Sequence, residues 1–191
     1  MAAALTTTKI MIIRHAEKPP SIGEPFGVTA LGDQDVESLT IEGWQRAGAL
    51  ACFFAPTDGP LQSAGLATPQ FLFASESKSG GGSARPVETI TPLSSKLGLT
   101  PTTHKKGNFD KVAADAMACG GIALISWQHE DIPLIANLIL GNQTTVPQKW
   151  PGDRFDIVWV FDLNASSNSY TFSQVPQRLL AGDSADLIKG P

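Results

Sequence analysis

The sequence predicts an α/β protein, a three-layer α/β/α sandwich in which a mostly parallel central sheet carries helices on both faces. Two observations predict this fold class. Short apolar runs alternate along the chain with segments whose apolar residues recur at helical spacing. In addition, 191 residues of which 42% are apolar are enough for one substantial core but not comfortably for two. We therefore expect a single domain spanning residues 1–191.

The first part of the chain predicts a strand, a loop and a helix. Residues 9–13 are apolar after Lys9, as in a buried strand, and this run leads directly into the largely polar residues 14–17. Residues 19–38 contain several Gly and Pro without a clear period, which predicts a loop. Thr40 is a typical helix cap, and the apolar residues that follow recur at helical spacing as far as Phe54.

The middle of the chain predicts a second strand and a second helix. Residues 71–75 are typical of a strand, and residues 77–83 form a Gly/Ser-rich, flexible insertion at its carboxyl end. Pro86 suits the first turn of a helix, and Gly98 suits the residue that ends it. Arg85 is therefore expected at the start of this helix.

The last part of the chain continues the alternation. A helix is predicted over residues 109–118, a strand over 122–126 and an apolar helix over 132–140. Two late strands, at residues 156–163 and 169–175, are separated by a polar turn and are expected to form an antiparallel pair at the edge of the sheet.

Polar groups follow three of these predicted elements at positions that converge in an α/β sheet. Ligands bind such sheets beyond the carboxyl ends of the strands, and Arg14-His15, the loop before Arg85, and His129-Glu130 all fall there. Arginine forks bind a phosphate dianion, and an imidazole can take the phosphoryl group while a second imidazole stabilises it. These residue types together indicate phosphoryl transfer.

The same segments resemble a known family. Residues 14–17, Arg-His-Ala-Glu after an apolar strand, resemble the Arg-His-Gly/Ala signature of the histidine phosphatase superfamily, which includes the phosphoglycerate mutases. Residues 39–47 resemble its Leu-Thr-x-x-Gly helix start, Arg85 with Thr89 resembles its second Arg-x-x-x-Thr, and residues 126–129 resemble the strand that leads to its second histidine. The matches occur in the family's order, so they are stronger together than any one motif alone.

The resemblance implies a function and a set of site residues. His15 would be the nucleophile that forms a phosphohistidine, and Arg14, Arg85 and His129 would hold the phosphate. The implied activity is that of a phosphatase that hydrolyses a phosphate monoester without a cofactor or metal. The helix after Arg85 lacks the acidic segment that supplies the proton donor in the mutase branch, so a phosphomutase is an alternative of lower rank. A phosphate- or phosphoprotein-binding module without catalysis is a third hypothesis.

The proton donor is less well defined by the sequence. Glu130 directly follows the second histidine, the position that holds the donor in the acid-phosphatase branch, and Asp131 and Glu17 are alternatives. Glu17 is also counted among the expected substrate-binding residues. Glu130 and Asp131 precede an apolar helix, however, so either could act only as a helix cap.

Composition excludes several classes of protein. The net charge of −4 argues against general affinity for nucleic acid, and no apolar run approaches the roughly twenty residues of a membrane span. No signal sequence is recognised, so we expect a cytoplasmic protein acting on a small phosphate ester or a phosphorylated protein. The histidines and cysteines lack metal-ligand spacing. Cys52 and Cys119 are expected to be buried thiols, and His104 is expected in an exposed connector without a role.

Overall fold

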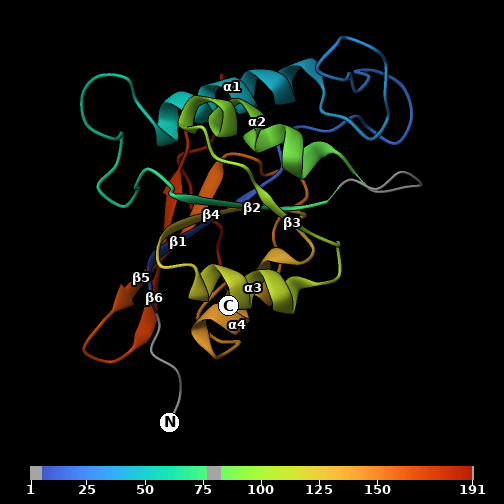
Figure 1. Ribbon diagram of the computed structural model, residues 1–191. Helices are drawn as coiled ribbons and strands as arrows, with labels where there is room; N and C mark the ends of the chain where they lie inside the picture. The colour runs from blue at the N-terminus through green and yellow to red at the C-terminus, as the bar shows by residue number, and fades with distance from the viewer. Residues whose placement is uncertain (1–5, 77–82, 191) are drawn as a thin grey trace.

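The protein, described by a computed structural model over residues 6–76 and 83–190, contains one mixed sheet with helices on both of its faces (Figure 1). Within these residues the sheet has six strands in the order β3-β2-β4-β1-β5-β6. The elements in chain order are β1 (Thr7–Arg14), α1 (Ile41–Phe54), β2 (Phe71–Ser75), α2 (Arg85–Leu97), β3 (Thr102–His104), α3 (Phe109–Ala118), β4 (Gly121–Trp127), α4 (Ile132–Leu140), β5 (Ile157–Asn164) and β6 (Ser169–Pro176).

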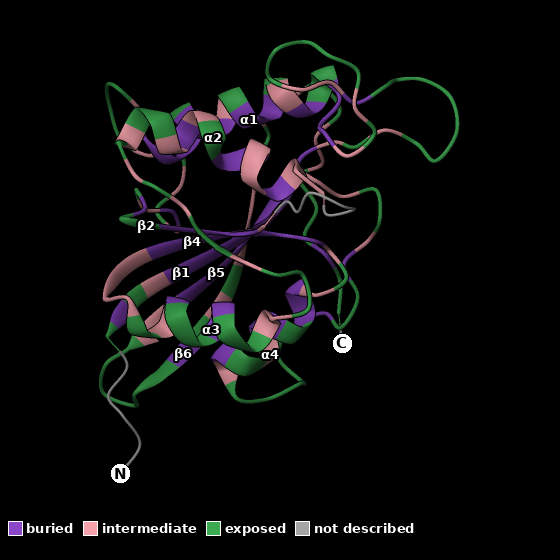
Figure 2. Ribbon diagram, turned by 45° about the vertical axis from the view of Figure 1, so that its right-hand side comes forward, coloured by how far each residue is buried: buried purple, intermediate pink, exposed green. Residues whose placement is uncertain are grey.

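The sheet is mostly parallel and is covered on both faces, which confirms the predicted three-layer sandwich. The neighbouring strands among β1, β4, β2 and β3 pair in parallel. Strand β5 is antiparallel to β1, and β6 is antiparallel to β5. Alternate residues of β1 point to opposite faces, as in any strand. Met11 and Ile13 pack with α1 and α2, while Ile10 and Ile12 pack with α3 and α4. Figure 2 shows the largely buried central strands lying between helices that carry both buried and exposed residues.

The structure corrects two expectations of the sequence analysis. Residues 102–104 form the short edge strand β3, paired with β2, and are not an exposed connector. The His104 side chain is only 12% exposed and lies 3.2 Å from Asp115. Cys52 is exposed, not buried, and Cys119 is partly buried, with neither in a disulfide. The neighbours of Cys52 in sequence are buried, but adjacent residues on a helix face different directions.

The carboxyl ends of β1, β2 and β4 lie at the same edge of the sheet. Arg14, the last residue of β1, is level with Trp127, the last residue of β4. Ala74, near the end of β2, is level with Ser126. The residues that follow these strands therefore emerge side by side. The predicted flexible insertion falls almost entirely on residues 77–82, which lie outside the described residues.

No helix in the described part of the chain is long and apolar enough to cross a lipid bilayer.

Helix α1 begins directly against the loop that follows β1. Thr40 caps the helix by accepting a hydrogen bond from the Gly43 amide at 3.1 Å, and its own amide donates to the carbonyl oxygen of Glu17 at 3.0 Å. A Cβ atom on Gly43 would lie 2.5 Å from the same Glu17 oxygen. Only glycine therefore lets the helix approach the segment that follows His15 this closely.

We expect Gly43→Ala to destabilise the protein by about 1–3 kcal/mol, because the added methyl group must displace backbone atoms. Gly48, in the same helix, is a matched control: a Cβ there meets nothing within 4 Å among the described residues outside its own helix. Gly48→Ala should stabilise the protein by about 1 kcal/mol through helix propensity alone. Chemical denaturation of both variants checks this, and equal effects would show that the close approach at Gly43 is unimportant.

Candidate active site

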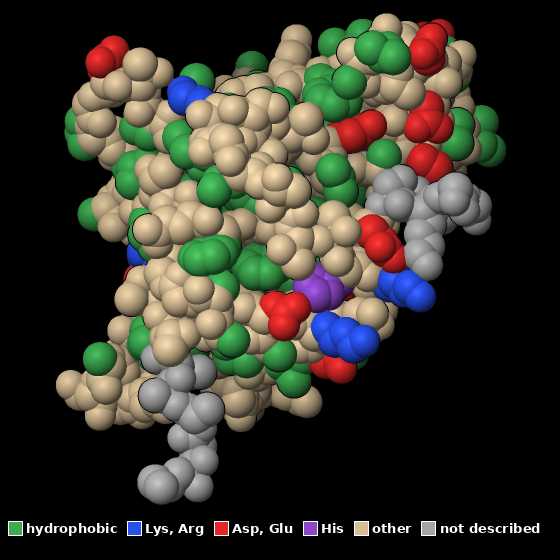
Figure 3. All heavy atoms as spheres, viewed as in Figure 1, with side chains coloured by type: hydrophobic (Ala, Val, Ile, Leu, Met, Phe, Trp, Pro, Cys, Tyr) green, Lys and Arg blue, Asp and Glu red, His purple; other side chains and the backbone are tan. Residues whose placement is uncertain are grey.

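A cavity of about 260 Å³ opens at the carboxyl edge of the sheet and brings together four of the residues singled out in the sequence: His15, Arg85, His129 and Glu130. We call it the His15 cavity. Its other lining residues are Lys18, Glu37, Glu76, Ser83, Lys106 and Gln128. Figure 3 shows the molecule in the same view as Figure 1, and most charged side chains on this face lie on the right-hand side of the picture. Strand β2 runs toward that side in Figure 1. Segments far apart in sequence thus meet at one charged recess.

His15 follows β1 and is held with one nitrogen free. Its amide donates to the carbonyl oxygen of Trp127 at 3.0 Å, which fixes the backbone against β4. Its Nδ1 lies 2.8 Å from the carbonyl oxygen of Ala16. Because a carbonyl oxygen can only accept, Nδ1 must carry the proton, and Nε2 of the neutral ring then keeps a lone pair.

The environment of His15 favours this neutral ring. The side chain is 3% exposed. Burial, together with the nearby charges of Arg14, Arg85 and His129, lowers the pKa of His15 to about 3, although the hydrogen bond to Ala16 acts in the opposite direction. At neutral pH the imidazole is therefore an unprotonated base surrounded by cationic groups.

Arg14 is buried, is not among the residues that line the His15 cavity, and retains unused donors. Its Nη1 donates to the carbonyl oxygens of Gly152 at 2.7 Å and Arg154 at 3.2 Å, and its guanidinium carbon lies 3.8 Å from the centre of the Phe155 ring. Among the described residues, no atom accepts a hydrogen bond from its Nε or Nη2, although both are buried. Burial lowers the pKa of Arg14 to about 10, so it stays charged at neutral pH. Unused buried donors on a cation are suited to an anionic ligand.

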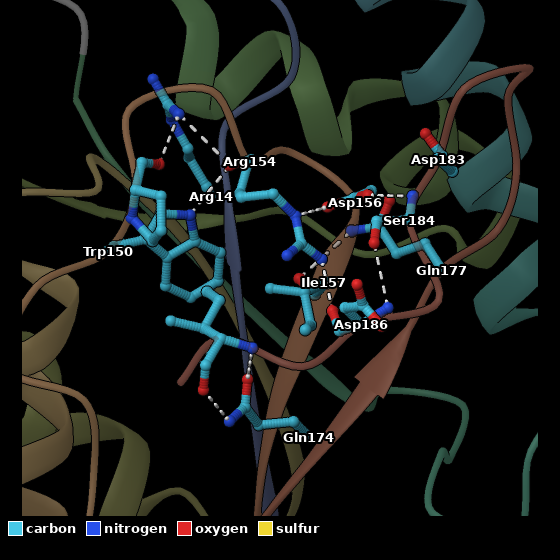
Figure 4. Close-up of polar contacts among 12 residues, drawn as sticks. Arg14, Trp150, Arg154, Asp156, Ile157, Gln174, Gln177, Asp183, Ser184 and Asp186 are labelled. Carbon is cyan, nitrogen blue, oxygen red and sulfur yellow. Dashed lines mark hydrogen bonds and ion pairs between the residues drawn. The ribbon is translucent and has the colours of Figure 1, made fainter. Parts of the chain in front are cut away.

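The segment that holds Arg14 is itself fixed by the C-terminal part of the chain (Figure 4). The carbonyl oxygen of Arg154 also accepts from the indole of Trp150, at 2.8 Å. The side chain of Arg154 donates to Asp156 at 2.6 Å and to the carbonyl oxygen of Asp186 at 2.7 Å. Asp156 in turn accepts from the amide of Ser184 at 2.7 Å. The position of Arg14 therefore depends on residues far along the chain.

Arg85 is the first residue of α2 and is held mainly by backbone carbonyls. Its Nε donates to Ser38 at 3.3 Å and its Nη2 to Val36 at 2.5 Å, while the carboxylate of Glu37 lies 3.6 Å away. Thr89 connects this helix start to the segment after His15. Its hydroxyl accepts from the Ala16 amide at 2.8 Å and donates to the carbonyl oxygen of Arg85 at 2.7 Å.

His129 and Glu130 follow β4 and also line the His15 cavity. The His129 Nδ1 is 3.2 Å from the Glu130 carboxylate, and the Lys106 ammonium is 3.8 Å from it. Burial and the charge of Arg14 lower the pKa of His129. Burial alone would raise the pKa of Glu130, but a backbone hydrogen bond and the charges of His129, Lys106 and Arg14 lower it overall. In the free protein Glu130 is therefore ionised at neutral pH.

The two alternative proton donors, Glu17 and Asp131, are not among the residues that line the His15 cavity. Glu17 does not line the His15 cavity, because its carboxylate pairs with Arg46 at 2.7 Å. Asp131 accepts a hydrogen bond from the indole of Trp127 at 3.2 Å and precedes α4. Long side chains can turn toward or away from a site, so the sequence does not determine which neighbouring carboxylate faces it.

The sequence analysis did not single out several lining residues. Lys18 directly follows the Arg-His-Ala-Glu motif, and Lys106 belongs to the basic pair at residues 105–106. Gln128, between β4 and His129, donates to the hydroxyl of Ser75 and lines the cavity. Adjacency to a motif could have pointed to Lys18 and Gln128, whereas Lys106 joins the cavity only through the tertiary fold. Within the described residues, no group of three or more His, Cys, Asp or Glu side chains is arranged to hold a metal ion.

Known structures share this fold. The chain resembles a proposed alpha-ribazole-5′-P phosphatase from Escherichia coli, with a TM-score of 0.57 and 12% identity over 93% of this chain and 100% of that one. It also resembles a phosphoserine phosphatase from Entamoeba histolytica, with a TM-score of 0.53 and 14% identity over 91% of this chain and 100% of that one. For a mycobacterial glucosyl-3-phosphoglycerate phosphatase the TM-score is 0.52 and the identity 11%, over 91% and 100%.

These neighbours define the class of fold. No protein-family model matches the sequence, and no curated protein matches it. The structural neighbours are phosphatases with the α/β fold of the histidine phosphatase superfamily. The chain therefore has the histidine phosphatase fold, which confirms at the level of fold the resemblance found in the sequence.

Proposed function

We propose that this protein is a member of the histidine phosphatase superfamily that hydrolyses a phosphate monoester through a phosphohistidine on His15, without a metal ion. One observation carries the proposal: His15 is a buried, neutral imidazole with the lone pair on Nε2, surrounded by cationic groups. A neutral imidazole is a nucleophile, and the cations around it stabilise the charge of a transferring phosphoryl group. The phosphatase names of the structural neighbours support the same reaction class.

The proposed reaction has two displacements. In the first, Nε2 of His15 attacks phosphorus, the ester bond to the leaving oxygen breaks, and Glu130 gives that oxygen a proton. In the second, Glu130 takes a proton from a water molecule whose oxygen attacks phosphorus. The bond from phosphorus to Nε2 then breaks and inorganic phosphate leaves. Arg14, Arg85 and His129 hold the phosphoryl oxygens throughout, and Arg14 can do so with its unused Nε and Nη2 donors.

Glu130 must be protonated before the first displacement, although neighbouring cations lower its pKa in the free protein. A phosphate dianion changes this balance, because its charge offsets that of His129, Lys106 and Arg14 and repels the carboxylate. Substrate binding therefore raises the pKa of Glu130 and promotes uptake of the proton that the reaction requires.

The substrate would be a small phosphate ester or a phosphorylated protein, and the cytoplasm is the proposed place of action. We further propose that residues 1–191 act as one domain.

A mutase would return the phosphoryl group to the substrate, and a binding module would release nothing. Inorganic phosphate as the product, measured on a panel of phosphate esters and phosphohistidine substrates, distinguishes hydrolysis from both alternatives.

His15→Ala should lower phosphatase activity by on the order of 10³-fold or more and abolish the acid-labile phosphoenzyme, because the nucleophile is gone. Phosphate release and acid-quench labelling measure the two effects, and circular dichroism checks the fold. The third histidine provides the control: His104 is on edge strand β3 and does not line the cavity, so His104→Ala should keep both activity and phosphoenzyme. Activity that survives His15→Ala would refute the mechanism.

Glu130→Gln should slow the hydrolysis of an alkyl phosphate by about 10²–10⁴-fold, because its leaving oxygen needs a proton. The effect on p-nitrophenyl phosphate, whose leaving group needs little help, should be within about tenfold. Asp131→Asn is the matched control, since this carboxylate bonds to Trp127 and does not line the cavity. Any effect of that variant should be equal for both substrates. If Glu130→Gln slowed both substrates equally, Glu130 would not be the proton donor.

A further inference from the structure

A second cavity adjoins the His15 cavity and has a different chemical character. It measures about 320 Å³ and is formed largely by residues 19–36, and we call it the outer pocket. Lys18 and Arg85 line both cavities, so the two recesses meet at these cations. A molecule that places an anionic group beside Arg85 in the His15 cavity can therefore extend into the outer pocket.

Beyond Lys18 and Arg85, the described lining of the outer pocket carries no charged side chain. Pro19, Pro20, Phe26 and Val36 provide apolar surface, and Ser21 and Gln34 add uncharged polar groups. Phe26 is 45% exposed and Val36 is 66% exposed, so both side chains are accessible to a bound group. The His15 cavity, by contrast, is lined by Glu37, Glu76 and Glu130 in addition to its cationic groups.

The wall of the outer pocket is fixed relative to Arg85. The carbonyl oxygen of Gly27 accepts from the Asp35 amide at 2.9 Å, and a Cβ on Gly27 would lie 2.7 Å from the Ser38 carbonyl oxygen. Ser38 and Val36 are the residues whose carbonyls hold the Arg85 guanidinium. One turn, at residues 35–38, thus packs against the backbone beside Phe26 and also orients Arg85.

The same turn is fixed to the rest of the protein. Glu88 on α2 accepts hydrogen bonds from the Ser38 hydroxyl at 2.7 Å and from the Leu39 amide at 2.8 Å. Trp44 on α1 donates to the carbonyl oxygen of Val28 at 2.8 Å. The part of the pocket formed by Gly27, Val36 and Arg85 is therefore held in place by contacts with the two helices.

We propose that the outer pocket binds the leaving group of the substrate, and that this group is uncharged, largely apolar and contains a flat ring. This inference rests on the proposed function, because it places the phosphate at His15. Lys18 and Arg85 line both cavities, so a group attached to a phosphate in the His15 cavity can extend past these two cations into the outer pocket. Phe26 offers a ring on which a flat apolar group packs.

The pocket can be tested by binding, without turnover. Methylphosphonate and 2-naphthylmethylphosphonate carry the same kind of anionic group and differ in the group that would enter the outer pocket. Isothermal titration calorimetry on the intact protein should show the naphthyl compound binding at least about tenfold more tightly. Phe26→Ala should reduce that preference by about fivefold and leave methylphosphonate binding unchanged.

Leu31→Ala is the matched control, because Leu31 belongs to the same loop, is 91% exposed and does not line the pocket. It should keep the full preference. Val36→Ser provides a second pocket variant and should reduce the preference in the same direction as Phe26→Ala. Equal binding of the two phosphonates by the intact protein, or equal effects of Phe26→Ala and Leu31→Ala, would overturn the proposed pocket. These results are independent of catalysis, so loss of the preference and failure of the phosphatase mechanism are distinguishable.

Discussion

The site depends on one constraint: a buried imidazole is kept neutral while cationic groups surround it. Burial alone disfavours protonation of His15, and the charges of Arg14, Arg85 and His129 add to that effect. The carbonyl oxygen of Ala16 then determines which nitrogen holds the proton. The same cations that keep the imidazole unprotonated attract a phosphate dianion. In the proposed function, the nucleophile and the substrate site are thus produced by a single arrangement of charge.

The surrounding structure holds these cations largely through backbone carbonyls. Arg14 donates to the carbonyls of Gly152 and Arg154, and Arg85 donates to those of Val36 and Ser38. A carbonyl fixes a guanidinium through a dipole and leaves its net charge available to an anion. Each of these cations therefore has a fixed position, and Arg85 in addition has the carboxylate of Glu37 3.6 Å away. The turn at residues 35–38, whose carbonyl oxygens hold Arg85, also contributes Val36 to the lining of the outer pocket.

The sequence predicted most of the fold, because buried strands and amphipathic helices have periods that can be seen locally. It missed β3, since three edge residues are too few to show a period. It predicted that His15, Arg85 and His129 would converge, because the carboxyl ends of parallel strands meet. It could not tell that Glu17 turns to Arg46 and Asp131 to Trp127, or that Lys106 reaches the cavity. Side-chain direction depends on partners distant in sequence, and a single sequence does not contain that information.

The protonation state of His15 tests this account most directly. Nitrogen NMR of the labelled imidazole, assigned by comparison with His15→Gln, reports both the charge of the ring and which nitrogen carries the proton. We predict a neutral ring protonated on Nδ1 at every pH from about 8 to 5, because burial lowers the pKa of His15 to about 3. A ring that gains a proton near the ordinary value of about 6.5, or that carries its proton on Nε2, would contradict the account.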